Sequence, residues 1–530
     1  MRIVVDASGP ARPLPQIWRF FGADEPNYAY MKDGQQLLSD IGKLSPGRMY
    51  FRAHSLLVTG DGTPALKWGS TNAYREDAQG HPIYDWTIVD RIFDTYLARG
   101  VKPYVEIGFM PEALSTHPQP YKHAWTPQAK YDQIFTGWAW PPTDYRKWGD
   151  LVYEWAKHCV DKYGRKEVEQ WYWETWNEAN IGYWRGTPDE FLKLHDFAID
   201  GVRRALPTAR VGGPDTAGDG GPFSRAFFEH QLRGINFATG GVGTPIDFAS
   251  FHAKGKPEFV DGHVRLGIAS QLSTIDAGFR LIASFPELKT TPIVIGESDP
   301  DGCAACQGPQ LAYRNTTMYA SYTAASFVRA LDLADRHGVR LEGALTWAFE
   351  FENQPWFAGF RVMASNGVPL PVFNVFRMFS LMAASRVPVT SDGEVSVDAM
   401  MKDGVRQGPD VSALATRDAR RVTVLVWHYH DDDVPGPAAA VTLAVNGLDA
   451  SAHSASVHEF VVDATHSNAY TAWQRMGSPQ APSPSQSAEL QAASALAPLA
   501  PPSRVALAGG SATLSISLPR QAVTLVQLEW

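Results

Sequence analysis

The stretch WTIVDRIFDTYLARGVKPYVEIGFMPEAL, residues 86–114, contains the unit that decides the fold. Its first half predicts an amphipathic helix over Trp86–Arg99, because apolar side chains recur at the three- and four-residue spacing of one helix face. Its second half predicts a buried strand over Lys102–Gly108, a short apolar run that ends in glycine. Helices that alternate with such strands are typical of parallel α/β folds.

The same alternation extends in both directions, from about residue 16 to residue 385. The predicted strands are Trp18–Gly22, Arg48–His54, Lys102–Gly108, Gln170–Trp176, Arg210–Gly213, Asp247–His252, Ile293–Glu297 and Gly343–Phe349. The predicted helices are Gly34–Leu44, Trp86–Arg99, Tyr145–Tyr163, Pro188–Leu206, Phe223–Leu232, Gly262–Ser284, Gln310–His337 and Val372–Ala384. Eight strands that alternate with eight helices predict a (β/α)8 TIM barrel, whose active site lies at the C-terminal ends of the strands.

The chain after Arg386 has a different pattern, with short strand-like runs and turns between them. We therefore predict an accessory β-sandwich domain after the barrel. The N-terminal run Arg2–Asp6 also has a strand pattern, and we expect it to pair with this second domain. The predicted domains are a catalytic barrel over 16–385 and an accessory domain built from 1–15 plus 386–530. The stretch 478–503 is rich in Pro, Ser and Ala, and predicts a surface loop with one short helix.

Composition excludes several classes of protein. The 530 residues include 47 Lys and Arg against 56 Asp and Glu, a net charge of −9, so neither nucleic acid nor an anionic membrane is an expected partner. The N-terminal sequence lacks the features of a signal peptide, and no apolar run is long enough to span a bilayer, so we expect a cytoplasmic protein, with a periplasmic location left open. Cys303 and Cys306 form either free thiols or a local disulfide. No motif indicates a metal or an organic cofactor.

The first candidate catalytic group lies in WYWETWNEANIGYW, residues 171–184. The fourth predicted strand ends at Trp176, which places Asn177 and Glu178 at the mouth of the barrel. A glutamic acid there can protonate a leaving-group oxygen, and the asparagine amide can bind a sugar hydroxyl beside the reacting carbon. The alternative is an ordinary solvated loop.

The second candidate lies in PIVIGESDPDG, residues 292–302, where Glu297 ends the seventh predicted strand. A carboxylate at the end of an apolar strand is costly unless it is paired or used, so the alternative is a structural ion pair. The mouths of strands four and seven face each other across a barrel. Two carboxyl groups so placed match the pair of a retaining glycosidase, about 5–5.5 Å apart, whereas about 6.5–9.5 Å indicates inversion.

At these residues the chain resembles glycoside hydrolase family 39, the family of β-xylosidases and α-L-iduronidases. The segments that carry the resemblance are FRAHSLL (51–57), VEIGFMPEAL (105–114), WNEANIGYW (176–184), DFASFHAKG (247–255) and VIGES (294–298), in the order expected for the family. The segment VSALATRDARRVTVLVWHYHDD (411–432) resembles the accessory β-sandwich of the bacterial xylosidases.

The resemblance implies a role for each candidate residue. Glu178 would be the acid/base and Glu297 the nucleophile. The implied substrate-binding residues are Asn177 at the 2-hydroxyl, His54 and His252 as donors to sugar hydroxyls, Trp347 as the aromatic floor, and Glu352 as a hydroxyl acceptor. Lys254 departs from the family pattern, because many relatives have tyrosine there. If Lys254 contacts Glu297, its charge would lower the pKa of the nucleophile.

These observations predict a retaining exo-glycosidase that needs no metal or cofactor and whose partner is a small glycoside or oligosaccharide. We expect a β-D-xylosidase that releases xylose from the non-reducing end of xylo-oligosaccharides. The alternatives are an α-L-arabinosidase, a β-galactosidase, a β-glucosidase, and a non-catalytic carbohydrate-binding protein. The oligomeric state is left open.

Overall fold

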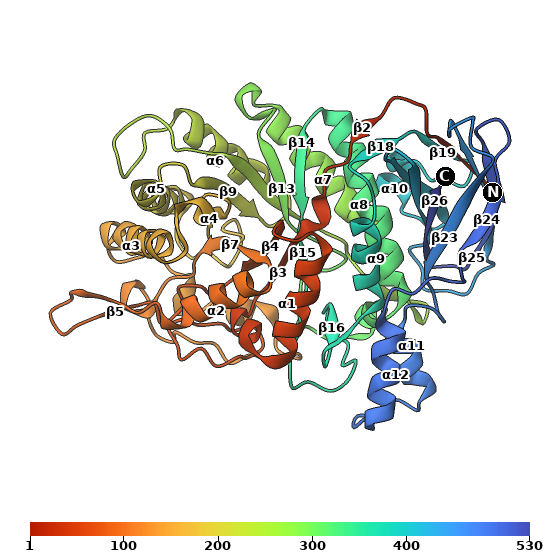
Figure 1. The fold of residues 1–530 in the computed structure, drawn as a ribbon. Helices are drawn as coiled ribbons and strands as arrows, with labels where there is room; N and C mark the ends of the chain where they lie inside the picture. The colour runs from red at the N-terminus through yellow and green to blue at the C-terminus, as the bar shows by residue number, and fades with distance from the viewer.

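A parallel barrel forms the larger part of the computed structural model, which describes residues 1–530 (Figure 1). Its strands lie in the order β14-β13-β10-β9-β8-β7-β4-β3-β15. Their bounds are β3 (Phe20–Ala23), β4 (Met49–Ala53), β7 (Val101–Ile107), β8 (Tyr172–Thr175), β9 (Arg210–Thr216), β10 (Phe248–Lys254), β13 (Pro292–Asp299), β14 (Arg340–Ala344) and β15 (Thr346–Trp347). Because β14 pairs with β13 and β15 pairs with β3, one eighth strand, interrupted at Leu345, closes the barrel. The predicted fold class is confirmed.

Amphipathic helices surround this barrel. They are α1 (Lys32–Leu44), α2 (Thr87–Ala98), α3 (Tyr145–Tyr163), α5 (Pro188–Ala205), α6 (Gly221–Arg233), α7 (Ile268–Ala283), α8 (Thr317–His337) and α9 (Pro371–Ser380), with the short α4 (Arg165–Val168) after α3. Helix α5 begins where the sequence predicts, because Thr187 and Glu190 form a capping box around Pro188 in the first turn. Helix α7 begins six residues later than its predicted start at Gly262, since the chain first forms a hairpin of β11 (Glu258–Val260) and β12 (His263–Arg265).

Two sheets form the smaller part of the molecule, a β-sandwich. One sheet has the order β19-β1-β22-β25 and the other β2-β18-β20-β21-β26-β23-β24. The bounds are β1 (Arg2–Asp6), β2 (Arg12–Pro13), β18 (Ser385–Val387), β19 (Val389–Ser391), β20 (Asp410–Arg417), β21 (Arg421–Tyr429), β22 (Ala439–Asn446), β23 (Ser454–Val462), β24 (Ser503–Ala506), β25 (Ala512–Leu518) and β26 (Val523–Glu529). β1 pairs in parallel with β22, and both termini lie in this part (Figure 1). We propose that residues 1–15 and 386–530 together form one domain, which surrounds the core of the β-sandwich.

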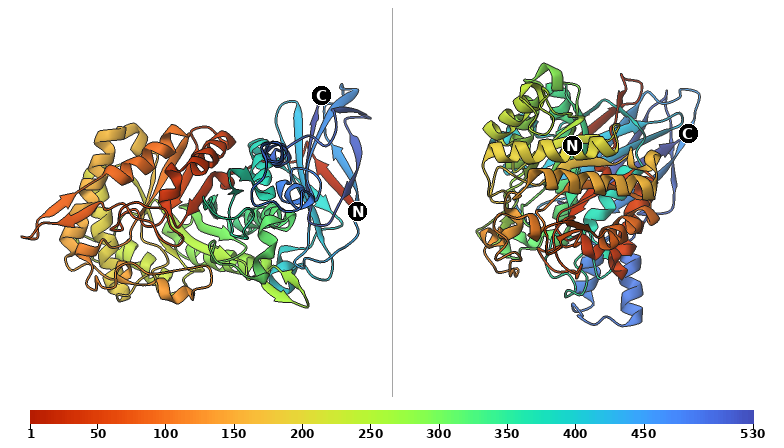
Figure 2. Two further views of the ribbon diagram at one scale, coloured as in Figure 1. Left: turned by 90° about the horizontal axis from the view of Figure 1, so that it is seen from below. Right: turned by 90° about the vertical axis from the view of Figure 1, so that its left-hand side faces the viewer.

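A helical insertion leaves the sandwich between β23 and β24. It consists of α11 (Ala469–Arg475), which the sequence analysis missed, and α12 (Pro484–Ser494), and it projects beyond the rest of the molecule (Figures 1 and 2). At its base, the Trp473 ring lies 5.0 Å from the Phe357 ring of the barrel. The remaining short elements are α10 (Val397–Asp403), β5 (Tyr74–Glu76), β6 (Pro82–Tyr84), β16 (Ala364–Ser365) and β17 (Val368–Pro369). None of the helices has both the length and the apolar character that crossing a bilayer requires.

Candidate active site

Glu178 lies just beyond the C-terminal end of β8, on a sharply turned segment. Trp176 and Glu178 both have positive φ angles, 71° and 44°, in a region that non-glycine residues seldom occupy. Two contacts hold this conformation, because the Glu178 N–H donates to the carbonyl of Asp215 at 2.9 Å and the Trp176 indole donates to the carbonyl of Tyr183 at 2.9 Å. The turn leaves the Glu178 side chain 13% exposed at the mouth of the barrel.

Glu297 lies within β13 and is surrounded by cations. Its carboxylate is 2.5 Å from Lys254 Nζ and 3.8 Å from an Arg52 nitrogen, and its side chain is only 7% exposed. Burial raises the pKa of Glu297, but the charges of Lys254, His252 and Arg52 outweigh burial and leave the pKa below its ordinary value. The carboxylate is therefore ionised at neutral pH. The sequence left open whether Lys254 reaches Glu297, and the structure shows that it does.

The two carboxylates approach the same atom, Nδ1 of His252. Glu178 Oε1 lies 2.9 Å from this nitrogen and Glu297 Oε1 lies 3.7 Å from it. The separation of the two oxygens therefore cannot exceed the sum of these distances, about 6.6 Å. This limit on one pair of oxygens includes the spacing of about 5–5.5 Å between the carboxyl groups of retaining glycosidases.

Both ring nitrogens of His252 contact carboxylates. Nε2 lies 2.7 Å from Asp215 Oδ2, and Nδ1 contacts Glu178. Burial lowers the pKa of His252, but Asp215 and Glu297 raise it to about 10. Both ring nitrogens of His252 are therefore engaged with carboxylates. The donor role that the family resemblance implies for His252 stays a prediction.

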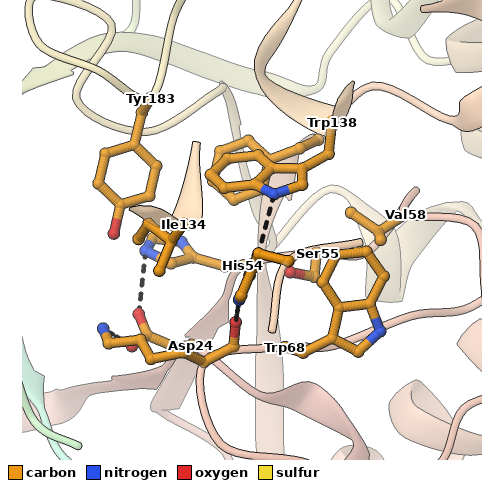
Figure 3. Close-up of a pocket in the computed structure, with 11 residues that line it drawn as sticks. Asp24, His54, Ser55, Val58, Trp68, Ile134, Trp138 and Tyr183 are labelled. Carbon is orange, nitrogen blue, oxygen red and sulfur yellow. Dashed lines mark hydrogen bonds and ion pairs between the residues drawn. The ribbon is translucent and has the colours of Figure 1, made fainter. Parts of the chain in front are cut away.

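A small cavity of about 20 Å³ lies next to His54, which also approaches Glu297 (Figure 3). Its lining residues are Asp24, His54, Ser55, Val58, Lys67, Trp68, Phe109, His123, Ile134, Trp138 and Tyr183. His54 joins the cavity to the carboxylates, because its Nε2 is 3.3 Å from Asp24 and 3.8 Å from Glu297. The Trp347 ring packs 4.3 Å from the His54 ring and donates its indole N–H to Asp24 at 3.0 Å. Trp347 and His54 thus lie together at the predicted site.

Asn177 presents an unpaired donor to the site. Its side-chain oxygen accepts a hydrogen bond from Arg52 at 3.3 Å, but its amide nitrogen is buried and has no partner. Buried polar atoms are nearly always hydrogen-bonded, so an unpaired one at the mouth of a barrel is available to a ligand. A hydroxyl oxygen is a suitable acceptor.

Comparison with known proteins identifies the family to which this chain belongs. A model described as glycosyl hydrolases family 39 matches residues 1–510. The chain belongs to glycosyl hydrolase family 39. It is therefore a glycoside hydrolase, an enzyme that cleaves O-glycosyl bonds.

Relatives of this family 39 enzyme include a β-xylosidase from Geobacillus stearothermophilus, 26% identical over 546 residues that cover 100% of this chain and 96% of the relative. An α-L-iduronidase from Mus musculus is 27% identical over 565 residues, 99% of this chain and 80% of the relative. The crystal structure of a monomeric β-xylosidase from Caulobacter crescentus CB15 has the same fold, with a TM-score of 0.76, 23% identity, and coverage of 100% of this chain and 99% of that one.

Glu352 lies apart from the family 39 carboxylate pair. Its carboxylate accepts a hydrogen bond at 2.9 Å from the backbone N–H of Asp33, in the first turn of α1. A carboxylate at a helix N-terminus is stabilised by the unpaired N–H groups there, which accounts for this position. The role of Glu352 as a hydroxyl acceptor stays a prediction.

Sequence reasoning missed a buried charged network beneath the family 39 site. Arg52, within β4, is fully buried and contacts Glu106 at 2.9 Å and Glu174 at 2.5 Å. Asp215, near the end of β9, contacts both Arg52 and His252. A charged residue that ends or interrupts an apolar strand is the signal that identified Glu297, and the same criterion would have found Asp24, Asp215 and Asp299. Nothing comparable marks Lys67, which lies in a loop and pairs with Asp24 only in the folded chain.

Proposed function

We propose that this family 39 enzyme is a retaining exo-glycosidase, and specifically a β-D-xylosidase that releases xylose from the non-reducing end of xylo-oligosaccharides. The observation that carries the proposal is the approach of Glu178 and Glu297 to one imidazole nitrogen, which limits their separation to about 6.6 Å. The choice of xylose is supported by the likeness to the Geobacillus β-xylosidase, which extends over the whole chain.

Glu297 is the nucleophile of the proposed mechanism. Its ionised carboxylate attacks the anomeric carbon while Glu178 donates a proton to the leaving oxygen, so that the glycosidic bond breaks as the bond to Glu297 forms. Glu178 then accepts a proton from a water molecule that attacks the same carbon and releases Glu297. Two inversions at one carbon leave the configuration of the sugar unchanged. The unpaired amide of Asn177 supports a contact with the 2-hydroxyl.

The loop between β7 and α3 lines the cavity, and we propose that it closes one end and so favours exo action. Phe109, Ile134 and Trp138 of this loop line the cavity, and the Tyr131 hydroxyl lies 2.6 Å from that of Tyr183. A cavity closed at one end accommodates the end of a chain and excludes its middle. Release of single sugars from one end is the expected result.

The test is a panel of 4-nitrophenyl glycosides with proton NMR of the first product. We expect the highest kcat/KM on the β-D-xyloside and β-xylose as the initial product. Greater activity on the α-L-arabinoside, β-galactoside or β-glucoside would change the proposed substrate and leave the proposed mechanism unchanged. α-Xylose as the initial product would contradict retention. Inactivity on every glycoside, with sugar binding intact, would leave the non-catalytic alternative.

An α-L-iduronidase is the second candidate. The observation in its favour is the Mus musculus α-L-iduronidase, whose likeness covers 99% of this chain at 27% identity, a match as extensive as that of the β-xylosidase. A fluorogenic α-L-iduronide therefore belongs in the panel. Hydrolysis of this substrate in preference to the β-D-xyloside would select the second candidate.

A further inference from the structure

Three side chains from neighbouring strands form a hydrogen-bonded chain at the C-terminal ends of the strands. Asp215 of β9 contacts His252 of β10, and His252 contacts Glu178 at the end of β8, with distances of 2.7 and 2.9 Å. The side chains of Asp215 and His252 are 0% exposed, whereas that of Glu178 reaches the cavity mouth. The hydrogen-bonded chain therefore connects a buried carboxylate to the proposed acid/base through one imidazole.

The geometry fixes the number of protons in this hydrogen-bonded chain. Each of the two hydrogen bonds needs one proton, and two carboxylates supply none while they are ionised. One proton lies on Nε2 and points at Asp215. The other lies between Nδ1 and Glu178, either on the ring, as imidazolium and carboxylate, or on Glu178, as neutral imidazole and carboxylic acid. The second arrangement is the one that a general acid requires.

We propose that His252 stores the proton that Glu178 delivers to the leaving group. This inference rests on the proposed function of Glu178. The one proton shared by Nδ1 and Glu178 first moves onto Glu178 and leaves a neutral imidazole. As the glycosidic bond breaks, Glu178 transfers this proton to the leaving oxygen and becomes a carboxylate, while Glu297 bonds to the anomeric carbon. In the second step water loses a proton to Glu178, its oxygen bonds to the sugar, the bond to Glu297 breaks, and the hydrogen bond to Nδ1 is restored. His252 acts through Glu178 and is a positioning residue.

The charges around His252 favour this storage. The groups that face it are Asp215 on β9, Glu178 after β8, Glu297 on β13, Arg52 and His54 on and after β4, and Lys254 on its own strand. Burial lowers the pKa of His252, but the carboxylates raise it to about 10. Burial raises the pKa of Asp215, but Arg52 and His252 lower it to about 2, so this carboxylate stays ionised. These charges thus favour a proton on the ring beside an ionised Asp215.

The test uses two substitutions of His252, each of which can keep one of its two contacts with Glu178 and Asp215. His252→Asn can place an amide near Nδ1, and His252→Gln can place one near Nε2, but neither side chain can hold a transferable proton. For each variant, kcat/KM is measured on the 2,4-dinitrophenyl glycoside, whose leaving group needs no proton, and on the disaccharide of the same sugar. We expect the ratio of the two values to rise about 100-fold, within the range typical of general acid catalysis. The alkaline limb of the pH profile should move to lower pH, because the variants lack the imidazole that shares the proton.

The ratio of two substrates on one preparation does not depend on how much of the variant folds. Asp215→Asn provides a second series, since it leaves His252 in place. This variant should shift the kcat/KM ratio and the alkaline limb in the same direction as the His252 variants do, but to a smaller extent. His54→Gln is the matched control, because His54 lies near Glu297 and not near Glu178, and its loss should be equal on both substrates. A wild-type ratio and alkaline limb in both His252 variants would overturn the proposal. If Glu178→Ala itself leaves the ratio unchanged, the role of Glu178 fails instead.

Discussion

The two sides of the sugar cavity hold their carboxylates in different surroundings. On the β13 side, Glu297 lies 2.5 Å from Lys254 and 3.8 Å from Arg52, two permanent cations. On the β8 side, Glu178 contacts His252, a cation that can give up its proton. Fixed positive charges keep a carboxylate ionised, whereas an imidazole can exchange a proton with it. The difference is the one that a nucleophile and an acid/base require.

The cations of the β13 side are balanced by buried aspartates. Lys254 lies 2.7 Å from Asp299, and Asp299 lies 2.7 Å from Arg361. Arg314 in turn lies 2.8 Å from Asp301. Buried charges are tolerated only in such paired sets, because an unpaired one costs several kcal/mol. The β13 side is therefore a rigid array of fixed charges, and the β8 side carries the mobile proton.

Removal of the nucleophile should have the largest effect. Glu297→Ala is expected to lower kcat roughly 10⁵-fold on every substrate, because no covalent intermediate can form. Added azide should restore turnover of activated substrates and yield a glycosyl azide of inverted configuration, which NMR identifies. Near-normal activity of this variant would show that the β13 side does not supply the nucleophile.

Removal of the acid/base should depend on the leaving group. Glu178→Ala is expected to lower kcat/KM by about 10²–10⁴ on a disaccharide and much less on the 2,4-dinitrophenyl glycoside. Azide should here give a glycosyl azide of retained configuration, the opposite of the result for Glu297→Ala. Equal losses of kcat/KM on both substrates would show that Glu178, on the β8 side, is not the acid/base.

The fixed charge of Lys254 should set the acidic limb of the pH profile. Since the cation lowers the pKa of Glu297, Lys254→Met should raise this pKa and move the acidic limb of kcat/KM to higher pH. A shift of one pH unit corresponds to about 1.4 kcal/mol and a tenfold loss below the limb. Lys254→Arg keeps the charge and is the control. An unmoved acidic limb in Lys254→Met would mean that the lysine does not govern the ionisation of Glu297.

The smallest effect is expected at the edge of the β13 side, where Cys303 and Cys306 form a disulfide after the strand. Because this bond closes only a short loop, Cys303→Ser with Cys306→Ser should lower stability by about 2 kcal/mol, or a few degrees in Tm. The turn keeps a second support, since Arg314 donates to the carbonyls of Cys303 at 2.7 Å and Cys306 at 2.5 Å. Activity should change little, and a tenfold loss would show that the turn controls the nucleophile.

Much of the fold follows from local pattern. The run of Trp86–Arg99 with Lys102–Gly108 predicted α2 and β7 within two residues at each boundary. Less predictable were segments whose conformation depends on distant partners. β9 continues through Pro214 and Asp215 to Thr216, although apolar residues end at Gly213, because its neighbour β10 pairs with Pro214 and Thr216. The hairpin of β11 and β12 replaces the first residues of a predicted helix, where Arg265 pairs with Asp432 of the sandwich.

The sequence by itself determined the barrel, the strand ends that carry Glu178 and Glu297, and the family resemblance, because hydrophobic periodicity and short motifs are local properties of the chain. Only the tertiary structure decided which charges surround each carboxylate. Lys254, Arg52, His252 and Asp215 lie on different strands, and their contacts with the pair depend on how the barrel closes. Electrostatic effects decay with distance in space and not along the chain, so the division of labour between the two carboxylates is a property of the folded protein.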